Sequence, residues 1–266
     1  MTHAWQTGTV ESDGERIYYE VTGAADAPAV VLGHGAGGSH ASWFQQVPAL
    51  ASAGYRVITW DTRGFGCSSY VTGVHGAEAS VRDLFRVLDA TSTDRAHLVG
   101  QSMGGWWVTN ATLDSPARVQ SLTLTNTIGG LWTPELREHT RQRAAAPEFN
   151  SGQLGVHSAL ARNFVERDPA RAFLYQQINS FHTPPMADIW TSLPKPIEHA
   201  AIDTTGVPVF AITSSGDELF PAPLVVDSIK QLARAKVVEV VDAGHSTYFE
   251  RPDEFNAVLL SFLASV

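Results

Sequence analysis

Short runs of β-branched and other apolar residues alternate along this chain with longer segments whose apolar residues recur at helical spacing. The runs expected to form strands are residues 16–21, 29–33, 56–61, 96–100, 119–125, 207–213 and 236–241. The clearest helical patterns cover residues 41–53, 79–91 and 253–263. Such an alternation is typical of a mostly parallel sheet with helices on both faces. The predicted fold class is therefore α/β, with a doubly wound sheet.

One segment interrupts this alternation. Between residues 131 and 200 no convincing strand occurs, arginines concentrate, and several prolines fall within HTPPMADIWTSLPKPIEHA. A structureless loop of that length would be abnormal in a compact domain, so we expect a helical insertion. We predict a core domain made of residues 1–130 and 201–266, and a helical cap, residues 131–200, inserted between two late strands.

Composition and charge exclude several functions. The 27 acidic and 18 basic residues give a net charge of -9, which would repel a nucleic acid. No apolar run approaches the roughly eighteen residues of a membrane span, and the N-terminal stretch lacks the order of a secretion signal. Cys67 is the only cysteine, so an internal disulfide is impossible. We expect a cytoplasmic protein without membrane contact, while monomer and dimer both remain open.

The stretch LVGQSMGG contains the pattern G-x-S-x-G, directly after a predicted strand and directly before a helical pattern. This is the context of a nucleophile elbow, a sharp turn that presents a serine. Gly100 and Gly104 would clear the space around Ser102, and we expect its hydroxyl to stand exposed above the sheet. A simple helix-capping turn gives the same pattern. Because a serine hydroxyl is a weak nucleophile, the assignment requires a base and an orienting acid.

Both partners occur later in the chain. VFAITSSGDELFP is an apolar run followed by Asp217, and VVEVVDAGHSTYFERP is another, followed by His245. Chemistry in open parallel sheets gathers at the carboxyl ends of strands, and the order serine, aspartate, histidine is that of nucleophile, acid and base. Asn126 also follows a strand but carries no charge, and Asp242 is better explained as a turn residue. We predict Ser102, Asp217 and His245 as the catalytic residues.

The loop VLGHGAGGSH allows two interpretations. It satisfies G-x-G-x-x-G, and Asp61 ends the next strand, as in a dinucleotide-binding fingerprint. The bulky His34 argues against that interpretation, which also leaves the serine, aspartate and histidine unexplained. The loop could instead supply half of an oxyanion hole. The backbone N–H groups of Met103 and Ala36 are then the expected donors, with Gly37 in reserve and His34 packing the loop.

Other motifs indicate structure rather than chemistry. Asp61 and Arg63 in WDTRGFGCSS are expected to hold a turn by hydrogen bonds. No phosphate loop of the Walker type, no H-E-x-x-H and no C-x-x-C occurs in the sequence. We therefore expect no metal and no cofactor.

Taken together, these pieces resemble the α/β-hydrolase superfamily. LGHGAGGSHASW, VITWDTRGFGCSS, LVGQSMGG, SSGDELFP and GHSTYFERPDEFN occur in the order found in that family. The resemblance implies Ser102, Asp217 and His245 as the triad, Met103 and Ala36 as oxyanion donors, and residues 131–200 as a lid. The serine at the elbow departs from the dehalogenase branch, and the loop lacks the HGGGPGA-like sequence of ring-cleavage-product hydrolases. The chain is closest to carboxylesterases and enol-lactonases.

The expected function is that of a serine hydrolase which cleaves a small carboxylic ester or lactone through an acyl-enzyme intermediate. Two alternatives on the same triad are a C–C bond hydrolase and a slow-turnover receptor for a small molecule. An NAD-dependent oxidoreductase is a more distant alternative.

Aromatic residues point to where a substrate would lie. Two roles are open for a set of apolar cap residues, an apolar ceiling over the substrate or the cap's own core. They are Trp132, Phe164, Phe181, Met186 and Trp190. The predicted substrate pocket is formed by Gly37, Trp132, Phe181 and Trp190. Trp106 and Trp107 follow the elbow and are expected to pack in the core.

Overall fold

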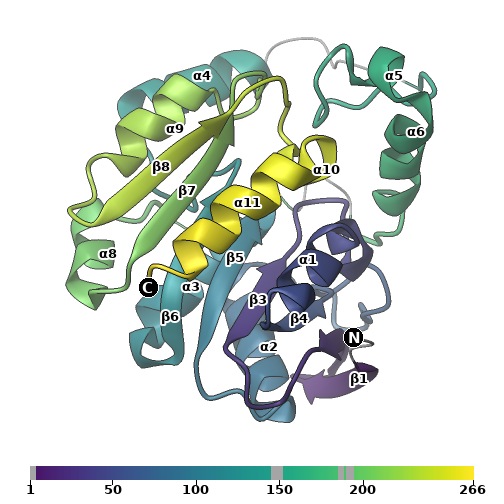
Figure 1. Cartoon of the computed structure of the whole chain (residues 1–266), viewed down its shortest axis with the longest axis vertical. Coiled ribbons are helices and arrows are strands. Elements are labelled where there is room, and N and C mark those ends of the chain that lie inside the picture. Colours follow the sequence, from purple (N-terminus) through teal and green to yellow (C-terminus); the bar gives the residue numbers. More distant parts are fainter. Residues whose placement is uncertain (1–3, 145–151, 185–188, 190–194) are drawn as a thin grey trace.

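The computed structural model describes residues 4–144, 152–184, 189 and 195–266. Its strands are β1 (Trp5–Ser12), β2 (Glu15–Thr22), β3 (Ala29–Gly33), β4 (Arg56–Trp60), β5 (Ala96–Gln101), β6 (Val119–Thr125), β7 (Val209–Ser214) and β8 (Ala235–Val240). They form one eight-stranded sheet in the order β1-β2-β4-β3-β5-β6-β7-β8 (Figure 1). β2 pairs antiparallel with β1 and β4, and every other pair is parallel. The predicted mostly parallel α/β sheet is confirmed.

Helices cover both faces of this sheet. They are α1 (Gln46–Ser52), α2 (Ala77–Ala90), α3 (Met103–Asp114), α4 (Pro134–Ala144), α5 (Phe164–Arg167), α6 (Pro169–Ile178), α8 (His199–Thr205), α9 (Ala222–Ile229), α10 (Thr247–Glu250) and α11 (Pro252–Leu263), with 3-10 turns η1 (His40–Trp43) and η2 (Pro116–Arg118). Helices α1 and α11 lie in front of the sheet in Figure 1, and α2 and α3 lie behind it. Two apolar cores result, one containing Leu84, Trp106 and Ile202, the other containing Leu50, Phe255 and Leu259. Trp106 and Trp107 are both buried, as expected.

The strand predictions agree with the structure to within a few residues, but two local predictions were wrong. β1 was not expected, because it is an edge strand whose residues are mostly exposed and not apolar. The helix expected over residues 41–53 is split into η1 and α1. Ser39 caps η1, since its side chain accepts a hydrogen bond from Ala41 N, and this favours a separate short turn.

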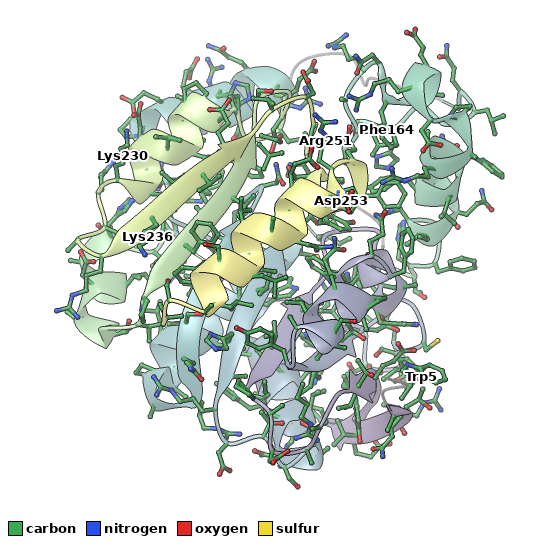
Figure 2. The ribbon with its side chains drawn as sticks, in the orientation of Figure 1. Trp5, Phe164, Lys230, Lys236, Arg251 and Asp253 are labelled. Carbon is green, nitrogen blue, oxygen red and sulfur yellow. The ribbon has the colours of Figure 1, made fainter. Side chains whose placement is uncertain are left out.

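Between β6 and β7 the described residues contribute helices α4, α5, α6 and α8, and no strand of the sheet. Phe164 of α5 packs on the C-terminal part of the chain, where its ring lies 6.2 Å from that of Phe249 (Figure 2). Helix α8 instead packs on α3, with Ile202 buried in the core. The division into core and cap remains a prediction. Within the described residues, no helix combines the length and the apolar character needed to cross a membrane.

Asp61 and Arg63 hold the turn after β4, as predicted. Asp61 Oδ2 accepts a hydrogen bond of 2.8 Å from Cys67 N, across the turn. Arg63 donates from Nε and Nη2 to the two carboxylate oxygens of Asp83 in α2, at 2.7 and 2.8 Å. Burial raises the pKa of Asp83 against the opposing effect of Arg63. Breaking such a buried pair is costly, so the turn is fixed relative to α2.

We predict that Gly104→Ala weakens the fold. A Cβ at residue 104 would lie 2.7 Å from the carbonyl carbon of Gly33 and from the carbonyl oxygen of His34, so α3 would have to move away from β3. The expected loss is about 2–3 kcal/mol of unfolding free energy, measured by urea denaturation. Gly8→Ala, on the edge strand β1, is the control, because the atoms nearest to a Cβ there belong to the side chain of Tyr19 and not to the backbone. Equal losses in the two variants would contradict the prediction.

Candidate active site

Ser102 occupies the sharp turn between β5 and α3. Its backbone has φ 48° and ψ -118°, a conformation that is strained for a residue with a side chain. The turn is held by a hydrogen bond of 3.1 Å that Ser102 N donates to Thr125 O at the end of β6. A Cβ at Gly100 would lie 2.5 Å from Gly104 O, which explains the glycine before the serine. The turn geometry is that of the predicted elbow.

The expected exposure of Ser102 was wrong. The residue is only 7% exposed. The loop after β3 lies over it, since a Cβ at Gly35 would be 3.2 Å from Ser102 Cβ. Substrate would therefore meet this serine in a buried setting rather than on an open surface.

Asp217 and His245 come together as the sequence predicts. His245 Nδ1 donates a hydrogen bond of 2.9 Å to Asp217 Oδ2, and both residues are buried. Asp217 Oδ1 accepts from the backbone N–H groups of Leu219 and Phe220, each at 2.9 Å. The carboxylate is thus fixed at one oxygen and directed at the imidazole with the other.

The opposite edge of the imidazole is available. His245 Nε2 is buried and has no hydrogen-bond partner within the described part of the chain, Ser102 Oγ included. With the proton of the neutral ring on Nδ1, Nε2 carries a lone pair that can accept a proton. Catalytic hydrogen bonds in unliganded enzymes are often long and tighten only when substrate binds.

Two supporting residues were not foreseen from the sequence. Gln101 directly precedes Ser102, and its Nε2 donates to the backbone oxygen of His245 at 3.1 Å. Asn126, considered above only as a weak candidate for the acid, donates to Asp217 Oδ2 at 3.1 Å and has φ 49°. The position of Asn126 at a strand end was the one available signal. Both side chains link loops that follow different strands of the sheet.

His34 has the structural role expected of it. Its side chain is fully buried, its Nδ1 donates to Gly35 O at 2.8 Å, and its Nε2 accepts from Thr62 N at 3.1 Å. Burial lowers the pKa of His34, so the ring is neutral at physiological pH. Nδ1 thus bonds within the loop after β3, and Nε2 holds this loop against the turn after β4.

The backbone N–H groups proposed for an oxyanion hole have no acceptor among the residues that the structure describes. Met103 is the first residue of α3, where helix N–H groups lack acceptors within the helix. Neither Met103 N nor Ala36 N donates to an acceptor in the described residues. Gly37 has φ 85°, and a Cβ there would lie 3.3 Å from Asn179 O, so this residue lies against the end of α6.

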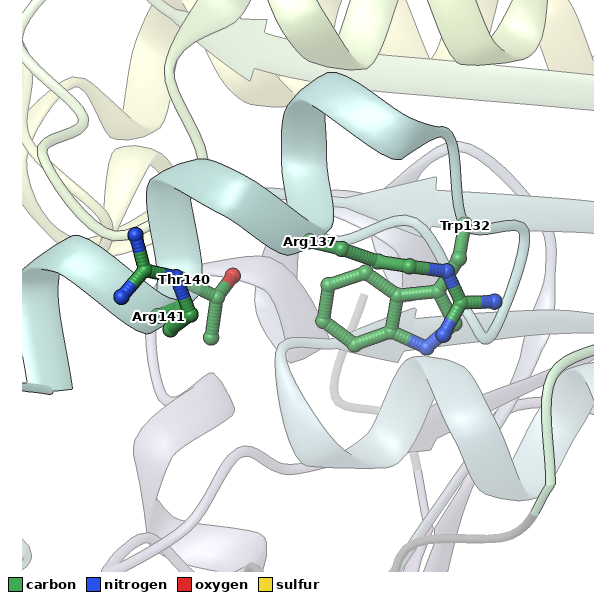
Figure 3. A pocket seen from close by; sticks show the side chains of 4 residues that line it. All are labelled: Trp132, Arg137, Thr140 and Arg141. Carbon is green, nitrogen blue, oxygen red and sulfur yellow. The ribbon is translucent and has the colours of Figure 1, made fainter.

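Of the predicted pocket residues, Trp132 is linked to His245 through the ring of Phe220. Its ring is 6.5 Å from that of Phe220, which in turn is 5.8 Å from the imidazole of His245. The Arg137 guanidinium lies over the Trp132 ring (Figure 3). Its carbon is 5.6 Å from the ring centroid. Trp132 and Arg137, together with Thr140 and Arg141, line a pocket of about 310 Å³. A second pocket, of about 420 Å³, reaches Asp217 between α4 and α9.

The other ceiling candidates are dispersed. Phe181 is 65% exposed, and its carbonyl accepts a hydrogen bond from Gly66 N at 2.9 Å, which places it at the surface beside the turn after β4. Phe164 is buried against the C-terminal segment. Met186 and Trp190 lie outside the described residues.

One group of possible metal donors occurs in the described residues. The ligand atoms of His40, Asp61 and Cys67 lie within 4.8 Å of one another. The Asp61 carboxylate already accepts hydrogen bonds from His40 Nδ1 and Cys67 N, at 2.8 Å each. The cluster is explained by the turn that Asp61 holds.

Comparison with known proteins agrees with this geometry. A family model described as the alpha/beta hydrolase fold matches residues 28–252. The chain therefore belongs to the α/β hydrolase family, as the sequence resemblance implied, and it is a hydrolase.

Several individual proteins are similar to this chain. The chain is 30% identical over 260 residues to 3-oxoadipate enol-lactonase 1 of Acinetobacter baylyi, a match that covers 95% of each chain. It is 49% identical over 111 residues to a putative carbamate hydrolase, RutD, of Variovorax paradoxus, which covers 41% of this chain and 42% of that protein. The solved structure of a hydrolase from Pseudomonas aeruginosa superposes with a TM-score of 0.81 at 26% identity, covering 97% of this chain and 98% of that one.

Proposed function

We propose that this protein is a serine hydrolase that cleaves a small carboxylic ester or lactone through an acyl-enzyme intermediate. One observation carries the proposal. The buried imidazole of His245 is fixed by Asp217 at 2.9 Å on one edge, while its other nitrogen has no partner in the described part of the chain. Gln101 ties that same loop to the elbow that holds Ser102. This is the arrangement by which a histidine can activate a serine.

In the proposed mechanism, Ser102 Oγ attacks the carbonyl carbon of the substrate while His245 Nε2 takes the hydroxyl proton. Asp217 stabilises the resulting imidazolium. The oxygen that becomes negative would be met by the backbone N–H groups of Met103 and Ala36, each worth about 3 kcal/mol in the transition state. His245 then protonates the leaving alkoxide. Water, deprotonated by the same imidazole, cleaves the acyl-enzyme and restores Ser102.

The substrate class follows from the aromatic wall and the relatives. Phe220 presents an apolar ring beside His245, and Trp132 lies behind it, which favours a small apolar acyl or aryl group. The likeness to an enol-lactonase over nearly the whole chain supports a lactone or enol ester. The likeness to a putative carbamate hydrolase supports a second candidate, a carbamate, which the same acyl transfer would cleave.

Replacing Ser102 by alanine should abolish hydrolysis. We expect kcat for p-nitrophenyl acetate to fall by about a thousandfold or more, because the nucleophile, base and acid act as a unit. A fluorophosphonate probe should label the wild type at Ser102 and leave Ser102→Ala unlabelled, as seen by peptide mass spectrometry. Ser265→Ala, near the end of the chain, is the matched control. Wild-type turnover in Ser102→Ala, or labelling at another residue, would refute the assignment.

We predict that Trp132 limits the size of the acyl group that the enzyme accepts. In Trp132→Ala we expect kcat/KM for bulky acyl esters to rise about tenfold relative to acetate, because the apolar wall near His245 recedes. A series of p-nitrophenyl esters of increasing acyl length, with an enol-lactone and a carbamate, measures this. Trp5→Ala is the control, since Trp5 is 63% exposed on the edge strand β1 (Figure 2). The same size profile in both variants would exclude Trp132 from the pocket.

A further inference from the structure

Glu250, the last residue of α10, carries a buried carboxylate that the proposed mechanism does not use. It is 4% exposed. Its Oε1 accepts hydrogen bonds from Gly244 N at 2.9 Å and from Ala161 N at 3.2 Å. Oε2 also lies 3.2 Å from Ala161 N. Gly244 immediately precedes His245, and Ala161 belongs to the segment between β6 and β7. One carboxylate therefore joins the histidine loop to that segment.

The backbones of these two parts are in direct contact. A Cβ at Gly244 would lie 2.6 Å from the carbonyl carbon of Leu160 and 3.0 Å from Ala161 Cα. The glycine lets residues 160–161 press on the histidine loop. Glu250 supplies hydrogen bonds across this contact. Two further bonds join the same parts, from Arg167 Nη1 to Asp242 O at 3.1 Å and between Tyr175 Oη and Ser246 Oγ at 2.7 Å.

Charged and titratable groups surround the Glu250 carboxylate. Arg167 of α5 is the nearest cation, with Nη2 3.5 Å from Glu250 Oε2, and its Nη1 donates to Asp242 O at 3.1 Å. Other titratable groups on the elements packed around this site include His157, Arg162, Glu166, Asp168, Arg171, Tyr175, Asp217, Asp242, His245, Tyr248, Arg251, Asp253 and Glu254. Burial raises the pKa of Glu250 to about 7, although the Gly244 and Ala161 amides and Arg167 each act to lower it. The charge of the carboxylate therefore changes near neutral pH.

We propose that Glu250 is a positioning residue whose ionised carboxylate holds the His245 loop against residues 160–161, so that the seating of this segment sets the position of the imidazole. The inference rests on the proposed serine hydrolase function. Protonation would remove the negative charge that both amides face, and a neutral carboxyl is a weaker acceptor. Activity should then fall on the acid side through loss of position as well as through protonation of the base.

The test is the pH profile of kcat/KM for p-nitrophenyl acetate, from about pH 5.5 to about pH 9. Glu250→Gln keeps the shape of the side chain but removes its charge. Above pH 8 we expect kcat/KM of Glu250→Gln to be about tenfold below wild type, a difference that shrinks below about pH 6.5 because wild-type Glu250 is then protonated too. Titration with a fluorophosphonate corrects both for the fraction of folded enzyme. Glu254→Gln, an exposed carboxylate in α11, is the matched control and should follow the wild type.

A second variant serves if Glu250→Gln does not fold. Arg167 is one-third exposed, so Arg167→Gln should fold. Removing this cation should raise the pKa of Glu250 and move the acid limb of the profile up by about half a pH unit, with little change at pH 9. An Arg167→Gln profile that superposes on wild type, or a Glu250→Gln deficit that is the same at every pH, would overturn the inference. A wild type that neither hydrolyses the ester nor reacts with the fluorophosphonate would overturn the proposed function as well.

Discussion

The close approach of helix α3 to strand β3 is the constraint on which the rest of the site depends. Gly104 packs on the backbone of Gly33 and His34, where a Cβ would lie 2.7 Å from His34 O. This approach requires the chain to turn within one residue between β5 and α3, and it places Ser102 at φ 48°. The same approach brings the loop after β3 over the serine. The position of the proposed nucleophile and that of its proposed oxyanion donors are therefore consequences of one packing contact.

The carboxyl ends of four neighbouring strands then deliver the remaining groups. Ser102 follows β5, Asn126 follows β6, Asp217 follows β7 and His245 follows β8. A parallel sheet fixes the strand ends to within a register step but leaves the loops free. Side-chain hydrogen bonds between loops supply the remaining order, from Gln101 to the histidine loop and from Asn126 to Asp217. Glu250 adds a contact from outside the sheet.

Sequence patterns predicted the parts of this structure that depend on local chemistry. The buried strands were predicted because short apolar, β-branched runs are typical of such strands. The elbow was predicted because glycines flank a serine directly after a strand. β1 was missed since an exposed edge strand carries no such apolar run. The burial of Ser102 was missed because it arises from a loop that is distant in sequence.

The supporting residues could not have been predicted in the same way. Gln101 and His245 are separated by 144 residues, and Ala161 and Glu250 by 89. Nothing in a single sequence indicates that a particular glutamine or glutamate has such a distant partner. Ala161 contributes only a backbone N–H, which every residue but proline possesses. Contacts of this kind become visible only when the strand order and the loop paths are known.

Strain and an unsatisfied polar atom coincide at this site. Asp13, Ser92, Ser102, Asn126 and Asp242 have positive φ among the described non-glycine residues, and of these only Ser102 and Asn126 are buried. Both lie at strand ends beside the histidine loop, where His245 Nε2 is buried and has no hydrogen-bond partner among the residues that the structure describes. Each feature costs free energy that a structure selected for stability alone would avoid. Their occurrence together agrees with the proposed function, in which this nitrogen would accept the proton of Ser102.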